Sequence, residues 1–267
     1  MAEDPVISVV IPVFNAAETL RATVGSVQAQ SRSDWELLLI DDGSNDSSGA
    51  VMASLAAEDP RIKCLATPAQ SGAGPARNVG LAAAKGRFIA FLDADDQWHP
   101  CKLELQLRAM AEMNQPFSCT AYLRRDAISG LETTFGVPNL ASRSDLLKTN
   151  TIACSTVIYD STFFGPRTMP DIRRRQDFAL WLELLQVTPV VLGLNKILMT
   201  YRVHPKSLSG RKGQAAIDTW QMYQKLGLSP AKRAWVFGNY AVRGLVRHRW
   251  PGLALHLGWL HQVRDEV

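Results

Sequence analysis

The chain has 267 residues, which is enough for one large α/β domain or for one domain with an extension. Its hydrophobic content of 46% and charged content of 20% are those of an ordinary soluble protein, and no apolar run is long enough to span a bilayer. The first five residues, MAEDP, lack the basic and apolar regions of a signal peptide, so we expect a cytoplasmic protein.

Apolar runs alternate with helical patterns in the first hundred residues. Leu20 and Val24 share one face of the first helical pattern, and Val51 and Leu55 mark the second. A third helix is expected over residues 76–85, with Gly86 as its C-cap. Such alternation predicts βαβ units and a parallel sheet. The expected strands are 7–13, 36–40, 62–65 and 88–92.

After Pro100 the elements are less regular, and from residue 214 the pattern is helical. We therefore expect one domain over residues 1–212, whose pattern changes at residue 100, and a helical extension over 213–267. The later elements that we expect are helices over 102–113 and 178–186, strands over 118–123, 156–159 and 197–203, and breaks at 227–230 and 251.

The four cysteines lie far apart and form no CxxC pair. This spacing argues against a zinc site or a disulfide framework. We expect reduced and mostly buried thiols at Cys64, Cys101, Cys119 and Cys154.

Four consecutive strand ends carry polar or glycine-rich loops. Ligands of open α/β sheets bind just beyond the carboxyl ends of the strands, so these loops predict one cleft. The loops hold Pro12, Phe14, Asn15 and Glu18 after the first strand, Asp42 after the second, Gly72 to Asn78 after the third, and Asp93 to Asp96 after the fourth.

The fourth loop is the most informative, because Asp93, Asp95 and Asp96 follow a buried apolar run directly. Carboxylates this close repel one another unless a positive group binds them. A divalent cation that also binds substrate phosphates would satisfy them, since hard cations take oxygen ligands. The alternative is a solvated acidic turn.

At this point the sequence resembles the family 2 glycosyltransferases, which are inverting nucleotide-sugar enzymes with the GT-A fold, of the type that builds bacterial surface polysaccharide and lipopolysaccharide. The resemblance covers residues 6 to 100 and then resumes in two short stretches. It implies a mainly parallel, mixed α/β sheet flanked by helices. It also implies a catalytic domain over residues 1–212, with a nucleotide-binding half (1–100) and an acceptor-binding half (101–212). The matching segments are VVIPVFN (9–15), DDGS (41–44), RNVG (77–80), FLDADD (91–96), QDFALW (176–181) and YRVH (201–204).

The resemblance implies roles for several residues in binding a UDP-sugar. Asp42 would accept a hydrogen bond from uracil, and Arg77 would lie near the base and the diphosphate. Asp42 could instead start a turn, and Arg77 could pair with a surface acid. Asp93 and Ala94 would belong to the DxD motif, with Asp93 holding the ribose or supporting the metal.

Asp95 would ligate Mn²⁺ or Mg²⁺, which would neutralise the departing diphosphate. Asp96 could bind metal or cap the following turn, and we favour the cap. His204 would complete the metal site or touch the diphosphate, although a lone histidine is more often structural. Arg202 would bind the diphosphate in a basic lid together with Ser207, Ser209, Arg211 and Lys212, for which the alternative is a solvated loop.

Inversion at the anomeric carbon needs a base that takes the proton of the attacking hydroxyl. By resemblance this base is Asp177, although Gln176 stands before it where glutamate is frequent. Asp177 could also serve as the N-cap of the helix that follows. An α-linked UDP-hexose donor would then give a β-linked product.

Charge is unevenly spread along the chain. Residues 1–205 hold 19 Lys/Arg and 22 Asp/Glu, whereas residues 206–250 hold nine Lys/Arg and one acid. Basic and aromatic residues mix at helical spacing over 229–263, which suits an anionic membrane surface near a lipid-linked acceptor. A helix pair packed on the domain, or a homo-oligomer interface, is the alternative. We expect no nucleic acid partner, because the rest of the chain is mildly acidic.

Two other functions compete with glycosyl transfer. A dinucleotide oxidoreductase would need a GxGxxG loop after the first strand, and the sequence there is PVFN. A membrane-associated assembly subunit could keep the fold and lose turnover. Retention of Asp42, Asp95 and Asp177 argues against that second alternative.

Overall fold

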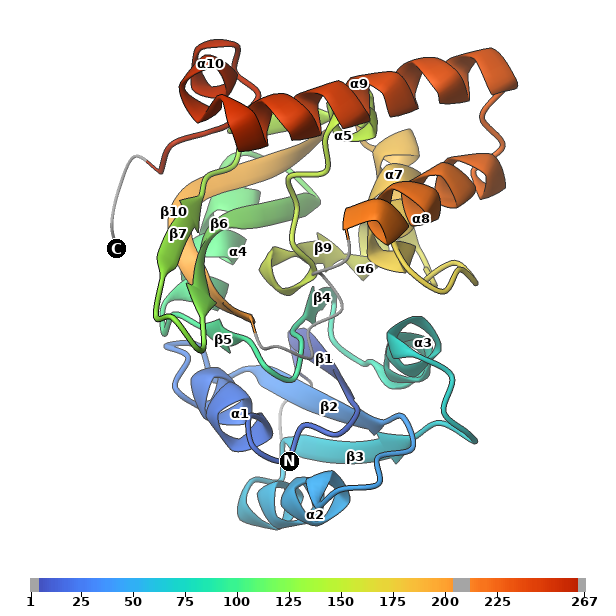
Figure 1. The fold of residues 1–267 in the computed structure, drawn as a ribbon. Coiled ribbons are helices and arrows are strands. Elements are labelled where there is room, and N and C mark those ends of the chain that lie inside the picture. The colour runs from blue at the N-terminus through green and yellow to red at the C-terminus, as the bar shows by residue number, and fades with distance from the viewer. Residues whose placement is uncertain (1–4, 204–211, 264–267) are drawn as a thin grey trace.

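The computed structural model describes residues 5–203 and 212–263. A single mixed sheet runs through the molecule with helices on both faces (Figure 1). Along the sheet the order is β3 (Ile62–Ala66), β2 (Trp35–Asp41), β1 (Ile7–Val13), β4 (Phe88–Phe91), β9 (Ile158–Asp160), β6 (Phe117–Asp126), β10 (Val190–Val203) and β5 (Gln97–Trp98). Outside this order, β7 (Glu132–Phe135) pairs with β6, and β8 (Leu140–Ser142) pairs with β10.

The first four strands form the parallel half of the sheet, as the βαβ pattern predicts. β1 pairs in parallel with both β2 and β4, and β2 pairs in parallel with β3. Their carboxyl ends therefore meet at one edge. Beyond β4 the sheet continues through the antiparallel strand β9, and β6 and β10 then pair in parallel. The expected GT-A-like α/β architecture is confirmed in this arrangement.

Each face of the sheet is covered by its own set of helices and has its own core. The core under α1, α2 and α4 contains Val9, Leu37 and Trp98, whereas the core under α3, α5 and α7 contains Val10, Leu38 and Trp181. Alternate residues of β1 and β2 thus face opposite helices. The bounds are α1 (Leu20–Gln28), α2 (Ser48–Glu58), α3 (Ala73–Ala83), α4 (Lys102–Glu112), α5 (Arg143–Lys148), α6 (Ser161–Phe164), α7 (Gln176–Val187), α8 (Lys212–Lys225), α9 (Pro230–Arg249) and α10 (Pro251–His256).

Helix α3 lies unusually close to the sheet, and Gly80 makes this approach feasible. A β-carbon at Gly80 would lie 2.6 Å from Val10 Cγ1 and 2.8 Å from Ile40 Cδ1. Gly86 is not the C-cap that the sequence predicted, because α3 already ends at Ala83. The amide of Gly86 instead donates to Ser8 Oγ (2.8 Å), and a β-carbon there would strike the backbone of β1.

Several element boundaries differ from the sequence prediction. Helix α7 begins at Gln176, two residues earlier than expected, and β10 begins at Val190 rather than at residue 197. The four cysteines are free thiols as expected, although Cys64 is exposed. In the described part of the chain, no helix combines the length and apolarity needed to cross a bilayer.

The C-terminal helices pack onto the domain rather than standing apart from it. Met222 and Tyr223 of α8 and Val236 of α9 are buried in the same core as α7. The Tyr223 hydroxyl donates to the carbonyl of Leu147 at the end of α5 (2.5 Å), and its ring packs edge-on against Phe178. The predicted division at residue 212 coincides with the start of α8, but this extension shares the core of the domain.

Candidate active site

The loops after β1 and β2 are tied to each other by polar contacts. Asn15 adopts a positive φ of 49° and accepts a hydrogen bond from the Asn45 amide through Oδ1 (2.9 Å). Its own amide donates to Ser44 Oγ (3.1 Å), and the amide of Ala17 donates to Asp46 (3.2 Å). Pro12 is half-buried, while Phe14 and Glu18 lie exposed on this rim. The first loop is therefore held in place mainly by the second.

Asp42 is buried and organises the loop that leads into α3. Its carboxylate accepts hydrogen bonds from Thr67 Oγ1 (2.9 Å), the Ser71 amide (2.9 Å) and the Gly72 amide (2.7 Å). Gly72 has a φ of 96°, which a residue with a side chain rarely adopts. A carboxylate has about four acceptor positions, so one remains for a further donor. The predicted contact with uracil stays a prediction.

The loop after β4 is held from both sides. From α1, the hydroxyls of Thr19 and Thr23 both donate to the carbonyl of Ala94 (2.8 and 2.9 Å). From the short helix at Cys154–Thr156, the hydroxyl of Ser155 accepts a hydrogen bond from the Asp93 amide (3.0 Å). The carboxylates of the DxD motif therefore stand on a backbone that is fixed before any ligand arrives.

The sequence predicted that Asp96 caps the following turn, but the structure shows other contacts for its side chain. It is 1% exposed and bridges two distant segments, since it accepts from Ser155 Oγ (2.6 Å) and from the Arg202 amide of β10 (3.2 Å). Burial, together with the charges of Asp93 and Asp95, raises the pKa of Asp96 well above its ordinary value. A positive partner at this position would lower the cost of ionising all three carboxylates.

Arg77 lies in this acidic environment and not at the surface. It is 5% exposed, and its Nη2 is 2.5 Å from Asp93 Oδ1. Its Nε is buried without a hydrogen-bond partner. Burial alone lowers the pKa of Arg77, but the neighbouring Cys154, Asp93 and Asp177 together raise it above the ordinary value. The guanidinium thus remains charged and has an unused donor.

Asp177 stands beside this pair at the start of α7. The N-cap of α7 is Arg175, in the left-handed region with a φ of 66°, so Asp177 lies in the first turn and is not the N-cap. Gln176 packs against the first turn of α3, where a β-carbon on Gly74 would lie 3.1 Å from Gln176 Cγ. The starts of α3 and α7 therefore abut, which brings Asp177 within electrostatic reach of Arg77.

Arg202 closes the far side of the site. Its Nη2 donates to Gln97 Oε1 (2.6 Å) while its backbone holds Asp96. The other residues of the predicted lid come after Arg202 in the chain. His204, Ser207, Ser209 and Arg211 lie outside the described residues, and Lys212 is described only by its place at the start of α8.

The donor set of this site fits a cation that also binds a substrate phosphate. Within residues 5–203 and 212–263, no three His, Cys, Asp or Glu side chains are arranged to hold a metal alone. Mg²⁺ typically takes one or two carboxylates and completes its shell with water and substrate phosphates. Asp95 and its neighbours match that type of site.

Some residues that shape the site were not predicted from sequence. Thr19, Thr23 and Ser155 act through their hydroxyls on the backbone of a loop that is more than 60 positions away. Their only signal in the sequence is a small polar residue inside an apolar pattern, which is a common feature of helices and turns. Contacts of this kind become visible only once the fold brings the segments together.

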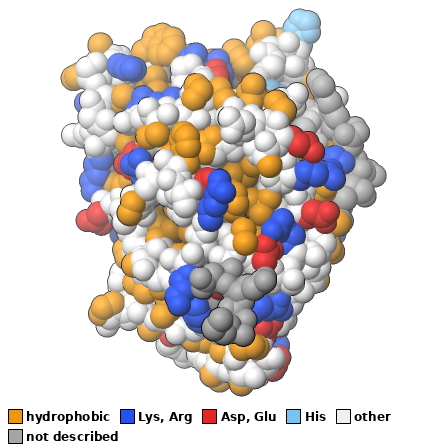
Figure 2. Space-filling view, turned by 180° about the vertical axis from the view of Figure 1, so that it is seen from behind, with side chains coloured by type: hydrophobic (Ala, Val, Ile, Leu, Met, Phe, Trp, Pro, Cys, Tyr) orange, Lys and Arg blue, Asp and Glu red, His pale blue; other side chains and the backbone are white. Residues whose placement is uncertain are grey.

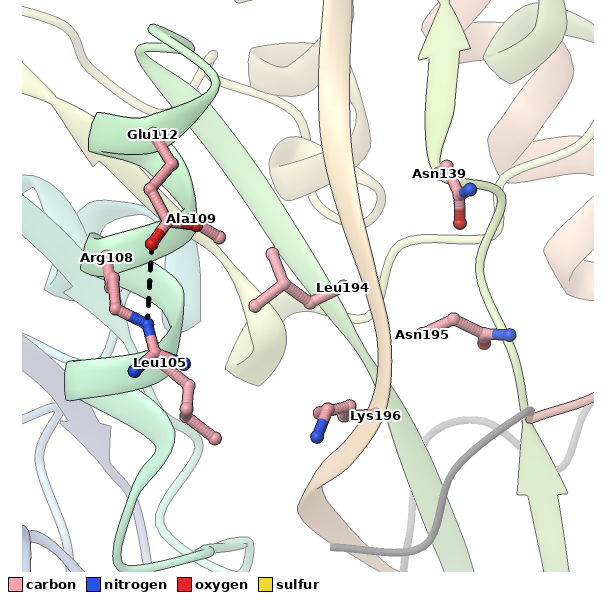
Figure 3. A pocket seen from close by; sticks show the side chains of 8 residues that line it. All are labelled: Leu105, Arg108, Ala109, Glu112, Asn139, Leu194, Asn195 and Lys196. Atoms are coloured by element: carbon pink, nitrogen blue, oxygen red, sulfur yellow. Dashed lines mark ion pairs between the residues drawn. The ribbon is translucent and has the colours of Figure 1, made fainter.

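A hollow of the surface lies away from the sheet edge, between α4 and β10 (Figure 3). It has a volume of about 280 Å³ and is lined by Arg108, Glu112, Leu194 and Lys196 among others. Arg108 and Glu112 pair with each other across one turn of α4 (3.7 Å). Neither the carboxylates of the DxD motif nor Asp177 reach this hollow, so we assign the chemistry to the sheet edge.

Comparison with known proteins identifies the family. The profile of glycosyl transferase family 2 matches residues 8–170, which include the strand ends that carry Asp42, Arg77 and Asp95. The chain belongs to this family. It is 38% identical over 239 residues to a putative teichuronic acid biosynthesis glycosyltransferase, TuaG, of Bacillus subtilis, covering 89% of this chain and 95% of that protein.

A second relative is the Escherichia coli protein WfgD, named as a UDP-Glc:α-D-GlcNAc-diphosphoundecaprenol β-1,3-glucosyltransferase. It is 34% identical over 249 residues, or 92% of this chain and 96% of that protein. Among solved structures, Staphylococcus aureus TarS with UDP-GlcNAc superposes with a TM-score of 0.69 at 16% identity, over 88% of this chain and 71% of that one. The Pyrobaculum calidifontis mannosyltransferase PcManGT, bound to GDP-Man and Mn²⁺, has a TM-score of 0.65 at 14% identity, over 96% and 80%.

The substitution Ser155→Ala removes the hydroxyl that connects the Asp93 amide to Asp96. We expect the affinity for Mn²⁺, measured by calorimetry in the presence of UDP, to fall about 10- to 100-fold, as is typical when a group behind the metal ligands is lost. Ser161→Ala is the matched control, because Ser161 donates to the Arg87 carbonyl at the other end of β9. Equal Mn²⁺ affinity in the two variants would contradict this role.

Proposed function

We propose that this glycosyltransferase is an inverting, metal-dependent enzyme that moves a sugar from a UDP-sugar to a hydroxyl of a lipid-linked glycan. The observation that supports it best is the meeting of Asp177, Arg77 and Asp93 where α3, α7 and β4 converge. A base, a cation and the DxD carboxylates are what one displacement at an anomeric carbon requires. The names of the relatives, which include UDP-glucose and diphosphoundecaprenol, support the substrate classes.

On the donor side, each group has a distinct role in this proposal. Asp42 has one acceptor position left for the N3–H of uracil, a proton that cytosine lacks. Asp95 and His204, with support from Asp93, would hold Mn²⁺ or Mg²⁺. When bound, that ion supplies Lewis-acid stabilisation of the leaving diphosphate. Arg77 adds a fixed positive charge and one unused donor beside it.

On the acceptor side, Asp177 takes the proton of the attacking hydroxyl. The new bond forms between that oxygen and the anomeric carbon, while the bond from the anomeric carbon to the UDP oxygen breaks. Asp177 is half-buried, so an acceptor can reach it, and the Arg77 guanidinium lies within electrostatic reach of it. A single displacement inverts the configuration, so an α-linked UDP-sugar gives a β-linked product.

The outer face of α9 and α10 suits an anionic membrane surface, where a lipid-linked acceptor would be found. Trp235, Val242 and Leu245 lie along one side of α9 and are 58%, 54% and 55% exposed. Trp250 and Leu253 extend the row into α10. Residues 229–263 contain five Lys/Arg and no acid, and Figure 2 shows hydrophobic and basic side chains together along the upper edge, where these helices lie in Figure 1.

A panel of nucleotide-sugars tests the reaction class. We expect slow release of UDP from one UDP-sugar with Mn²⁺ or Mg²⁺, and loss of this release in EDTA, because the leaving diphosphate is then left without its counter-charge. Release of GDP from GDP-mannose, with no response to any UDP-sugar, would overturn the role of Asp42. Failure to bind any nucleoside diphosphate in calorimetry would favour an assembly subunit without turnover.

The substitution Asp177→Asn tests the base. We expect kcat to fall about 10²- to 10⁴-fold, because an amide cannot accept the hydroxyl proton, while UDP affinity stays unchanged. Asp171→Asn is the matched control, since Asp171 is exposed in the segment that precedes α7. A variant at Asp177 that turns over at the rate of the control would refute the assignment.

The double substitution Trp235→Glu and Leu245→Glu tests the membrane surface. We expect the wild type to sediment with phosphatidylglycerol vesicles, less so at high salt, and the variant to bind about tenfold more weakly or worse. Ile128→Glu is the control, because Ile128 is 78% exposed at the β6–β7 turn. If the substitutions instead dissociate a dimer in ultracentrifugation, the face binds a second copy of the chain.

A further inference from the structure

The inner face of the second half of α9 carries an unusual basic cluster. Tyr240, Arg243 and Arg247 are spaced by three and four residues, so they share one side of the helix. All three are half-buried, whereas Val242 and Leu245 on the other side are exposed. We call Tyr240, Arg243 and Arg247 the inner cluster of α9.

Within the described residues, the two arginines of the inner cluster have no acidic partner. Neither forms an ion pair there, and the Nε atoms of Arg243 and Arg247 are buried without a hydrogen-bond partner. The charge of Arg243 acts on Asp145, but the Asp145 carboxylate already accepts hydrogen bonds from the amide and hydroxyl of Ser142. The guanidinium of Arg243 lies over the ring of Trp259, 4.9 Å from its centroid.

Two neighbouring cations in a partly buried site are costly unless an anion joins them. Burial, and to a smaller degree the like charge of Arg243, lowers the pKa of Arg247. The other groups that act on Arg247 are the phenols of Tyr240 and Tyr122. The site thus offers unused N–H donors and positive charge, which are the requirements for binding an anion.

The inner cluster adjoins the acceptor side of the catalytic centre. The Tyr240 hydroxyl accepts a hydrogen bond from Arg175 Nη2 (3.2 Å), and Arg175 is the residue from which α7 and Asp177 begin. The phenol of Tyr122 is within electrostatic reach of both Arg247 and Asp96. Tyr122 therefore lies near both the acidic centre and Arg247.

Tyr122 belongs to a cluster of three aromatic rings. Its ring stacks on Phe135 with centroids 4.9 Å apart and planes at 7°, and Tyr201 packs edge-on at 6.3 Å. Carboxylates, aromatic rings and the arginines are therefore neighbours. They match the groups that a donor with its cation, a sugar and an acceptor phosphate would need.

We propose that Arg243 and Arg247, with Tyr240 beside them, form a binding site for the diphosphate group of a lipid-linked acceptor. The planar fork of arginine matches phosphate oxygens in two-point contacts. The diphosphate of the donor belongs at the DxD carboxylates. The acceptor class rests on the proposed function, whereas the anion site itself rests on the geometry of α9.

The location of the lipid tail agrees with this site. The same helix presents Trp235, Val242 and Leu245 outward, so a diphosphate at its inner face would have its lipid next to the proposed membrane surface. Figure 1 shows α9 along the edge of the molecule, at the far end of the sheet from β3. One helix would then contact the membrane with its outer face and bind the charged head of the acceptor with its inner face.

The experiment measures binding of octyl diphosphate to the full chain by calorimetry, without any sugar. We expect Arg243→Gln and Arg247→Gln each to weaken binding about tenfold or more, because each loses charge-assisted contacts to phosphate. Arg249→Gln is the control, since Arg249 is exposed on the same helix and its substitution removes the same charge. Binding of UDP with Mn²⁺ should be equal in all four proteins.

The other probes identify the source of the phosphate. Inorganic pyrophosphate should compete with octyl diphosphate, and phosphatidylglycerol vesicles should bind the two inner variants as well as the control. Equal affinity of all variants for octyl diphosphate would overturn the site, as would no binding by the wild type. Loss of UDP binding in the inner variants would overturn the acceptor assignment. Absence of UDP release from any UDP-sugar refutes only the proposed function, because diphosphate binding is measured separately.

Discussion

The buried ion pair between Arg77 and Asp93 connects the parts of this site. Arg77 comes from α3, Asp93 follows β4, and Asp177 of α7 acts on the same guanidinium. Loss of one partner of such a pair leaves a buried charge and costs about 3–5 kcal/mol. The close approach of α3 to the sheet, which depends on Gly80, and the contact of Gln176 with Gly74 therefore matter for chemistry as well as packing. They fix the positions of Arg77 and Asp177 relative to the sheet.

A second constraint acts on the acidic loop. Asp96 is too deeply buried to contact solvent, and its carboxylate links Ser155 to the backbone of Arg202. Arg202 lies in β10, so one carboxylate joins the loop after β4 to the strand that ends just before residue 204. In the proposed function, a cation that arrives with its phosphates would relieve the repulsion among Asp93, Asp95 and Asp96. Donor binding would then be coupled to the position of β10.

The parts of the structure that follow from local pattern were predictable, and those that depend on distant contacts were not. The strands at 7–13 and 62–65 and the breaks before α9 and α10 follow from apolar runs, glycine and proline. Asp42 was recognised by its motif, but its hydrogen bonds to residues 67–72 depend on how the loop folds back. The cap predicted for Asp96 was wrong. A cap uses a partner nearby in the chain, whereas the actual partner of Asp96 is Ser155, which is 59 positions away. The N-cap expected at Asp177 failed since Arg175 takes that position in a left-handed conformation.

The C-terminal helices show why such an extension would remain attached to a catalytic domain. If they served only to bind a membrane, their inner face would be expected to be purely apolar, as it is around Val236 and Tyr223. Arg174 instead pairs with Asp218 of α8 (3.3 Å), and Arg175 bonds to Tyr240 of α9. Both contacts hold the turn that precedes Asp177. The left-handed backbone conformation of Arg175 costs about 1–3 kcal/mol, so it needs such support. A force or ligand that shifts α9 would therefore act on Asp177, the proposed base. Binding of an acceptor at the inner cluster and orientation of Asp177 would then be two consequences of one helix position.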